Sequence, residues 1–245
     1  SMIRQLQDMT GVDPLTVPLT DRKVLSIFNG IEALDIKDPD YKFTHGSYAI
    51  PEFGTSFVRQ MLDDIKPDRF ADLVRISGFS HGTDVWLNNA QDYIRQGVAT
   101  MREVISTRDD IMNYLMLKGI ENKMSFQIME DVRKNRPLKE GQLAVMKEHG
   151  VPQWYIDSCI KIQYMFPRAH AVAYTMMSFR MAWYKVYYPL EFYATYFTSV
   201  AGDFNAEVIL QGKNAILERM RLIDARGHEA TAKDNNEMTV LEVAY

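Results

Sequence analysis

Apolar residues recur at intervals of three and four positions along most of this chain, the spacing that gathers them on one face of an α-helix. Residues 55–67 show the pattern well, because Thr55 can cap the first turn and Pro67 stops the helix. Similar patterns predict further helices over these ranges: 20–30, 67–76, 87–95, 107–117, 122–135, 140–149, 152–165 and 205–226.

Strand-like alternation of apolar and polar residues is scarce in this sequence. The exceptions lie near the two termini and between residues 36 and 54, where Asp38-Pro39-Asp40, Gly46 and Pro51 punctuate short apolar pieces. The predicted fold class is therefore mainly α, a multi-helix domain with at most a small β ribbon.

The longest predicted helix lies between Pro167 and Pro189. One of its sides is a continuous apolar stripe that suits a core, formed by Val172, Met176, Phe179, Trp183 and Val186. The opposite side mixes rings, hydrogen-bonding groups and charge, and it is formed by His170, Tyr174, Met177, Met181 and Lys185, with Arg168 at the start of the helix. The two sides therefore predict different environments.

The same region is locally cationic and rich in aromatic residues. No Asp or Glu occurs between Ser158 and Leu190, whereas four Lys or Arg residues do. A nucleotide needs cations for its phosphates and a flat surface for its base, and Arg168, His170 and Tyr174 offer both within two helical turns. Periodicity alone leaves open the alternative that Tyr174 and the methionines are core residues.

A second candidate site is the run Arg75-Ile76-Ser77-Gly78-Phe79-Ser80-His81-Gly82-Thr83-Asp84. Its two glycines allow a sharp turn that presents amides, hydroxyls and an imidazole together, with Arg75 on the preceding helix. This arrangement predicts an anion-facing loop. The same residue types also occur in ordinary turns between helices, and the run lacks the GxxxxGK[ST] pattern of a P-loop.

Composition limits the classes of function that remain. The 245 residues are 47% hydrophobic and 24% charged, which is typical of a folded chain, and the net charge of −4 means that nucleic acid would need a local basic surface. The single cysteine, Cys159, excludes an intramolecular disulfide, so a reducing, cytoplasmic setting is expected. No apolar run is long enough to cross a membrane, and no membrane partner is expected.

No self-sufficient active site is visible in the sequence. The paired acids at 38–40, 63–64 and 109–110 suit helix ends or turns, and no nucleophile or zinc-ligand spacing occurs. Catalytic residues and metal ligands are therefore expected to be absent from this chain. The basic run at positions 133–139 suits a solvated surface.

The composition of the sequence changes near residue 201, where Ala201-Gly202-Asp203 interrupts the aromatic region and a more charged helix follows. We expect one domain over residues 1–200. Residues 201–245 would begin a following domain or extend the first one. Ser1-Met2 resembles a cloning scar, and the whole suggests a piece of a longer protein.

Two long motifs resemble the PolC-type alpha subunit of bacterial DNA polymerase III. These are Leu73-Val74-Arg75-Ile76-Ser77-Gly78-Phe79-Ser80-His81-Gly82-Thr83-Asp84-Val85-Trp86 and Met165-Phe166-Pro167-Arg168-Ala169-His170-Ala171-Val172-Ala173-Tyr174. Shorter supporting matches are Thr10-Gly11-Val12-Asp13-Pro14, His45-Gly46-Ser47-Tyr48, Ile50-Pro51-Glu52-Phe53-Gly54 and Tyr188-Pro189-Leu190-Glu191-Phe192. The SGFSHGTD motif favours the PolC type, found in low-GC Gram-positive bacteria, over the related DnaE type.

The resemblance implies the fingers domain of a replicative DNA-directed DNA polymerase, a nucleotidyltransferase that acts in DNA replication. It implies that Arg75 and Arg168 contact the triphosphate, that His81 and the turn around it, with Ser77 and Ser80, close over the nucleotide, and that His170 and Tyr174 lie against the nascent base pair. Position 168 is commonly lysine in this motif, so Arg168 keeps the charge but changes the contact geometry.

The implied partners are the incoming deoxynucleoside triphosphate (dNTP), primer-template DNA, the palm and other domains of the polymerase, and replisome components. Mg²⁺ would be held by palm aspartates outside this chain, so the chain alone is expected to be inactive. A rival interpretation is a helical protein–protein interaction module whose aromatic helix docks a partner. The rival predicts Tyr and Trp side chains exposed on a flat patch, whereas a nucleotide site predicts Arg75, His81, Arg168 and His170 converging on one concave surface.

Overall fold

The computed structural model describes all residues from 1 to 245 and contains fourteen α-helices and no strand. The only β-type pairing is a single antiparallel bridge between Thr83 and Tyr164. The predicted mainly α fold class is therefore confirmed, and residues 36–54 form turns and irregular segments in place of a ribbon. No helix combines the length and the apolar character that crossing a membrane requires.

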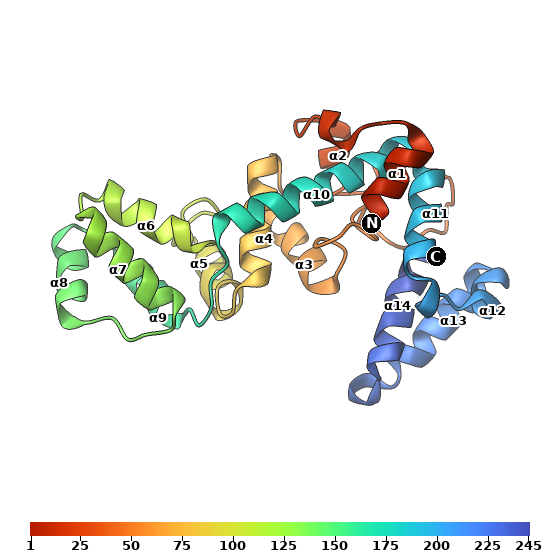
Figure 1. Cartoon of the computed structure of the whole chain (residues 1–245). Coiled ribbons are helices and arrows are strands. Elements are labelled where there is room, and N and C mark those ends of the chain that lie inside the picture. Colours follow the sequence, from red (N-terminus) through yellow and green to blue (C-terminus); the bar gives the residue numbers. More distant parts are fainter. The chain divides into compact units, whose positions relative to one another are not determined.

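The chain divides into two compact units, and it passes from one to the other within α3 and again within α10. Unit 1 comprises residues 1–59 and 177–245, and unit 2 comprises residues 60–176. The two helices that cross this division are α3 (Ser56–Ile65) and α10 (Arg168–Tyr187). The colours of Figure 1 allow each unit to be followed along the chain.

Unit 1 is built from helices at both ends of the sequence. These are α1 (Met2–Thr10), α2 (Arg22–Ser26), α11 (Pro189–Ser199), α12 (Ala206–Leu210), α13 (Lys213–Asp224) and α14 (Ala232–Ala244). A ring cluster fixes its core, where Phe28 packs edge-on against Phe53 at 5.2 Å and parallel to Phe179 at 6.4 Å. A second, smaller apolar cluster joins α13 and α14 through Ile216, Ile223 and Leu241.

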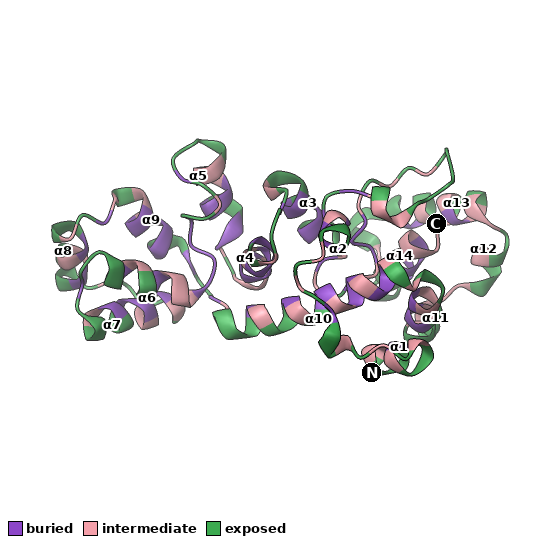
Figure 2. Ribbon diagram, turned by 90° about the horizontal axis from the view of Figure 1, so that it is seen from above, coloured by how far each residue is buried: buried purple, intermediate pink, exposed green.

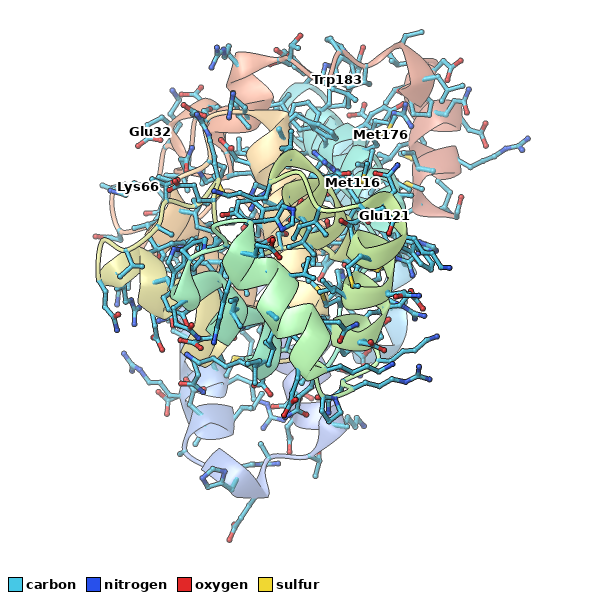
Figure 3. The ribbon with its side chains drawn as sticks, turned by 90° about the vertical axis from the view of Figure 1, so that its left-hand side faces the viewer. Glu32, Lys66, Met116, Glu121, Met176 and Trp183 are labelled. Carbon is cyan, nitrogen blue, oxygen red and sulfur yellow. The ribbon has the colours of Figure 1, made fainter.

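Unit 2 holds the remaining helices. These are α4 (Phe70–His81), α5 (Gln91–Arg95), α6 (Arg108–Leu117), α7 (Asn122–Arg133), α8 (Glu140–Glu148) and α9 (Gln153–Lys161). Helices α6 and α7 pack side by side and are joined through Gly119, whose φ of 86° suits glycine (Figure 1). Met116 and Glu121, which flank that turn, are labelled in Figure 3.

Helix α4 differs from its sequence prediction in a way that matters for the site. The expected helix over 67–76 instead runs to His81, so the Ser-Gly-Phe-Ser-His run is helical and the expected sharp turn is wrong. Gly78 explains the tight packing at this place, because a Cβ there would lie 2.3 Å from Ser106 Oγ. The glycine serves a close approach between α4 and residues 106–107 and does not bend the backbone.

Helix α10 also packs differently from the expected stripe. The apolar residues Val172, Met176, Trp183 and Val186 are only half-buried. The buried positions of α10 are the small residues Ala171, Thr175, Ser178 and Ala182 together with Phe179, Met181, Tyr184 and Lys185. Of the expected stripe only Phe179 is fully buried, and the small side chains on the buried face let neighbouring backbone approach the helix. Figure 2 shows the exposed first turn of α10 and its burial farther along.

Lys185 is the clearest correction on this helix, because it was expected on the mixed, ligand-facing side. It is 2% exposed, and its Nζ donates hydrogen bonds to the carbonyl oxygens of Gly46 (2.7 Å) and Tyr48 (2.6 Å). Burial lowers the pKa of this amine to about 7. Lys185 is thus a structural donor inside unit 1.

Candidate functional site: two arginines at a cavity of unit 2

The Arg75 side chain leaves the middle of α4 and is held in one position by its neighbours. Its Nε donates to the carbonyl oxygen of Met101 (3.0 Å) and its Nη2 to that of Val104. Its Nη1 lies 3.6 Å from a carboxylate oxygen of Asp110 on α6. The guanidinium is therefore a fixed charge with a defined orientation.

The groups around Arg75 shift the pKa of its guanidinium in both directions. Burial lowers the pKa of its guanidinium, the Asp110 carboxylate raises it, and the positive charge of Arg168 lowers it again. Arginine keeps its proton in folded proteins, so the guanidinium carries a positive charge.

Arg168 is the first residue of α10, and its position is fixed through its backbone. The Arg168 N–H donates to a carboxylate oxygen of Asp109 at 2.7 Å, which satisfies one of the free donors at the helix start. Its side chain is exposed and has no ion-pair partner. This guanidinium is therefore an uncompensated positive charge.

The two arginines line the same cavity, although they are far apart in the sequence. The cavity measures about 230 Å³ and is also lined by Val74, Ser106, Asp110 and Val172. A second cavity of about 360 Å³ shares Arg75, Asp110 and Arg168 and adds aromatic walls from α6 and α9. Two cations and one acid at the smaller cavity leave a net positive charge, which suits an anionic ligand.

The remaining predicted residues gather in an aromatic cluster around Phe166. The His81 ring stacks on Phe166 at 4.7 Å, and the Tyr174 ring lies nearly parallel to Phe166 at 6.1 Å. The His170 ring meets Phe166 edge-on at 5.8 Å. His170 and Tyr174 are exposed, and neither they nor His81 line the arginine cavities. The structure therefore brings the predicted residues together as two groups and does not place all of them on one concave surface.

The geometry of α10 explains this division. Arg168 and Val172 are four residues apart and share one side of the helix, whereas His170 and Tyr174 are also four apart and share another. The His81 end of α4 lies beside the second side, since its ring is 6.3 Å from that of Tyr174.

The two serines of the motif lie on α4 between Arg75 and His81. Ser77 is 1% exposed and its hydroxyl has no hydrogen-bond partner. The Ser80 hydroxyl is half-buried and donates to the Ser77 carbonyl at 3.0 Å. Neither serine lines the arginine cavities.

Sequence reasoning did not single out Ser106, Asp109 or Asp110 as parts of this site. The Ser106 hydroxyl donates to the Arg75 carbonyl at 2.7 Å, and an Asp110 carboxylate oxygen accepts the Ser106 N–H at 3.0 Å. Their sequence signal was a helix start with acids in its first turn. That signal predicts that these residues cap a helix, but it does not predict that they contact Arg75 and Arg168.

The interaction-module alternative predicted exposed Tyr and Trp side chains, and Tyr164, Tyr174 and Tyr187 are exposed whereas no tryptophan is. Trp86 is 3% exposed, and Trp154 and Trp183 are half-buried. Within this chain no group of three His, Cys, Asp or Glu residues is arranged to hold a metal ion.

The known proteins that are similar to this chain share one description, bacterial DNA polymerase III. Residues 1–151 match a family described as "Bacterial DNA polymerase III alpha subunit finger domain". Relatives described as "DNA polymerase III PolC-type" include those of Caldanaerobacter subterraneus subsp. tengcongensis (55% identical), Clostridium perfringens (53%) and Thermotoga maritima (50%). Each alignment covers all of this chain, which spans 17 or 18% of the length of these relatives.

Proposed function

Because this chain belongs to the family of bacterial DNA polymerase III alpha subunit finger domains, we propose that it binds the incoming dNTP in a replicative DNA-directed DNA polymerase and positions the nascent base pair for nucleotidyl transfer. The observation that carries the proposal is the convergence of Arg75 and Arg168 on one cavity. The resemblance expected from the two long motifs is confirmed by the family match and the PolC-type relatives.

The two arginines suit different parts of the task. Arg75 is held by two carbonyls and by Asp110, so it offers a fixed positive field at the cavity wall. Arg168 is exposed and unpaired, so its planar guanidinium is available for two parallel hydrogen bonds to a phosphate. Preorganised cations of this kind stabilise charge that develops during phosphoryl transfer.

The aromatic cluster suits the base. His170 and Tyr174 present exposed rings, and Phe166 packs behind them against His81. Stacking of a base on such rings contributes about 1–3 kcal/mol and tolerates any base, which a replicative polymerase requires. In this proposal Ser77 and Ser80 belong to the helix wall that carries Arg75 and His81.

The other partners follow from the proposed role. They are primer-template DNA, the palm and further domains of the polymerase, and replisome components. DNA polymerases generally use divalent metal ions, and in this proposal Mg²⁺ is held by palm aspartates outside this chain. The contribution of this chain is then binding and orientation.

Replacement of Arg168 tests the proposal in the complete polymerase. We expect Arg168→Ala to lower kcat/KM for dNTP about 10- to 150-fold, which corresponds to about 1.5–3 kcal/mol for lost charge-assisted bonding. Arg168→Lys should recover part of this loss because it restores the charge without the planar fork. Steady-state extension of a primed template measures both.

A matched control is Arg221→Ala, since Arg221 is an exposed arginine on α13 that forms only an ion pair with Glu218 three residues away. It should leave kcat/KM unchanged. If Arg168→Ala behaves like this control, Arg168 does not contact the nucleotide and the proposed site is wrong.

A further inference from the structure

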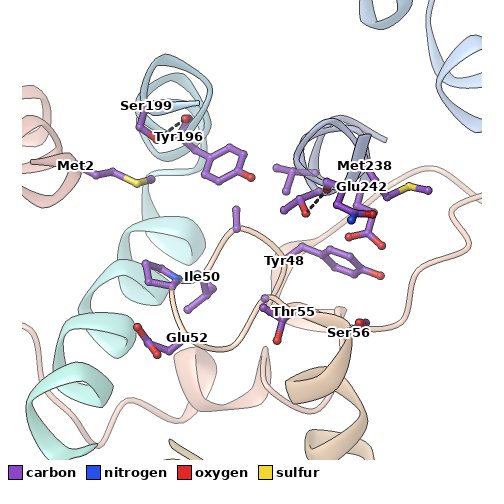
Figure 4. Close-up of a pocket in the computed structure, with 16 residues that line it drawn as sticks. Met2, Tyr48, Ile50, Glu52, Thr55, Ser56, Tyr196, Ser199, Met238 and Glu242 are labelled. Carbon is purple, nitrogen blue, oxygen red and sulfur yellow. Dashed lines mark hydrogen bonds between the residues drawn. The ribbon is translucent and has the colours of Figure 1, made fainter. Parts of the chain in front are cut away.

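A cavity larger than the two arginine cavities lies within unit 1 and has no part in the site above. It measures about 590 Å³ and lies between the 48–56 loop on one side and helices α11 and α14 on the other (Figure 4). Cavities of a few hundred cubic ångströms with apolar walls and few polar groups are typical binding sites for small molecules. Its size and lining therefore suit a small-molecule ligand.

The loop that forms one wall is fixed at several points. Lys185 Nζ donates to the Gly46 and Tyr48 carbonyls, and the Ser178 hydroxyl donates to the Pro51 carbonyl at 2.7 Å. Gly46 itself is packed so closely that a Cβ would lie 2.5 Å from the Ile27 carbonyl oxygen. These anchors hold the wall open before any ligand arrives, which reduces the entropy lost on binding.

The backbone of the same loop is strained. Ala49 and Glu52, neither of them glycine, have φ values of 66° and 70°, in the left-handed region that side chains disfavour. Such a backbone conformation costs free energy, and residues of this kind cluster at ligand-binding segments. Both line the cavity.

Two polar groups at the cavity lack partners within the chain. One carboxylate oxygen of Glu242 pairs with Arg59 at 3.2 Å, whereas its other oxygen accepts no hydrogen bond. The Tyr196 side chain extends from α11 toward the cavity, is 8% exposed, and its hydroxyl has no partner (Figure 4). Both groups line the cavity and keep free hydrogen-bonding capacity, so both are candidates for ligand contacts.

The charge of the lining restricts the ligand. Glu52 and Glu242 are the only charged side chains that line the cavity, so a phosphate or carboxylate would be repelled. An N–H donor would instead satisfy the free Glu242 oxygen. Ile50, Met238 and the Tyr196 ring offer apolar contact to a flat molecule.

We propose that this cavity binds a planar heteroaromatic amine without anionic groups, with its N–H groups donating to Glu242 and its ring packed against Tyr196, Ile50 and Met238. The proposal is independent of the nucleotide site, because every residue in it belongs to unit 1.

The probe is 2-aminobenzimidazole, titrated into the 245-residue chain and followed by ¹⁵N–¹H NMR. We expect shift changes confined to residues around the cavity. Benzimidazole-2-carboxylate, which has the same ring and the opposite charge, should cause none at the same concentration.

Three variants test separate contacts. Glu242→Gln should raise the Kd of the probe at least fivefold, because it removes the charged acceptor, and Tyr196→Phe should raise it about threefold. Met238→Trp should abolish the shifts by filling the space. Glu218→Gln, an exposed acid on α13, is the control and should leave the Kd unchanged.

Glu242→Gln also weakens the pairing of Arg59, so its folding is checked by circular dichroism, and if it unfolds the other two variants decide. The proposal is overturned if the probe causes no localised shifts up to its solubility limit. It is equally overturned if Tyr196→Phe and Met238→Trp bind the probe as the unmodified chain does.

Discussion

At the scale of single residues, burial lowers the pKa of two cations of this chain, Arg75 and Lys185. Arg75 is surrounded by two carbonyl acceptors and Asp110, and it keeps its charge because arginine starts from a very high pKa. Lys185 has two carbonyl acceptors but no carboxylate beside it, and burial lowers its pKa to about 7. Arg75 is therefore suited to supply a permanent positive charge. Lys185 is suited to a structural role that depends on pH.

Lys185 should therefore make the stability of unit 1 depend on pH. Its pKa is about 7 in the folded chain and about 10.5 when unfolded, so the unfolded state binds more protons between these values. The free energy of unfolding should then rise with pH above 7, by up to about 1.4 kcal/mol per pH unit, with no slope from this group below 7. Urea unfolding at fixed pH values from 7 to 9 measures it.

The comparison that isolates this residue is Lys185→Met, in which that slope should disappear. The range stops at pH 9 because burial raises the pKa of Cys159 to about 12, which gives an opposite slope at higher pH. Lys233→Met, at an exposed lysine of α14, should keep the slope of the unmodified chain. Equal slopes in all three proteins would mean that Lys185 is not buried as a neutral amine.

At the scale of elements, α4 shows how a contact can override local sequence signals. Its Gly and Ser residues favour a turn, yet the helix continues to His81 because Gly78 lets residues 106–107 pack directly on it. The Ser106 hydroxyl then bonds to the Arg75 carbonyl at 2.7 Å. Gly78 thus lets α4 hold residues 106–107 in place, and Ser106 in this segment contacts Arg75.

Gly78→Ala should destabilise the protein although alanine is the better helix former. The gain in helix propensity is about 1 kcal/mol, but the new Cβ would lie 2.3 Å from Ser106 Oγ and 2.8 Å from Thr107 Cγ2, and overpacking typically costs about 1–3 kcal/mol. We expect a net loss of stability, measured as a lower urea midpoint, and partial recovery in Gly78→Ala/Ser106→Ala.

The control is Gly141→Ala in α8, where a Cβ would meet nothing within 4 Å. This change should stabilise the protein by about 0.5–1 kcal/mol. If Gly78→Ala stabilises equally, the close approach at residues 106–107 does not constrain α4.

At the scale of the whole molecule, the C-terminal region has two kinds of contact. Helices α13 and α14 have their own apolar cluster, which fits the predicted boundary near residue 201. Yet the Tyr245 ring lies 5.5 Å from that of Tyr41 and Glu242 pairs with Arg59, so the same region also packs on the N-terminal part of unit 1. The boundary itself stays a prediction.

Deletion of residues 201–245 should distinguish a separate domain from an extension. Because the deletion removes the partners of Arg59 and Tyr41, we expect amide hydrogen exchange to become faster in residues 36–59. Residues 108–133, in unit 2, should keep their protection and serve as the internal reference. Unchanged exchange in residues 36–59 would favour an independent domain after residue 200.

The sequence by itself determined the mainly α class, most helix positions and the family, because helix periodicity, caps and long motifs are local properties of the chain. It also identified Arg75 and Arg168 through charge and resemblance. Only the tertiary structure decided that these two share a cavity while His170 and Tyr174 face another side of α10, and that Lys185 is buried. It alone disclosed the cavity beside Tyr196 and Glu242, whose walls come from distant segments. The physical reason is that periodicity shows which residues share a helix face, whereas burial and charge depend on what packs against that face.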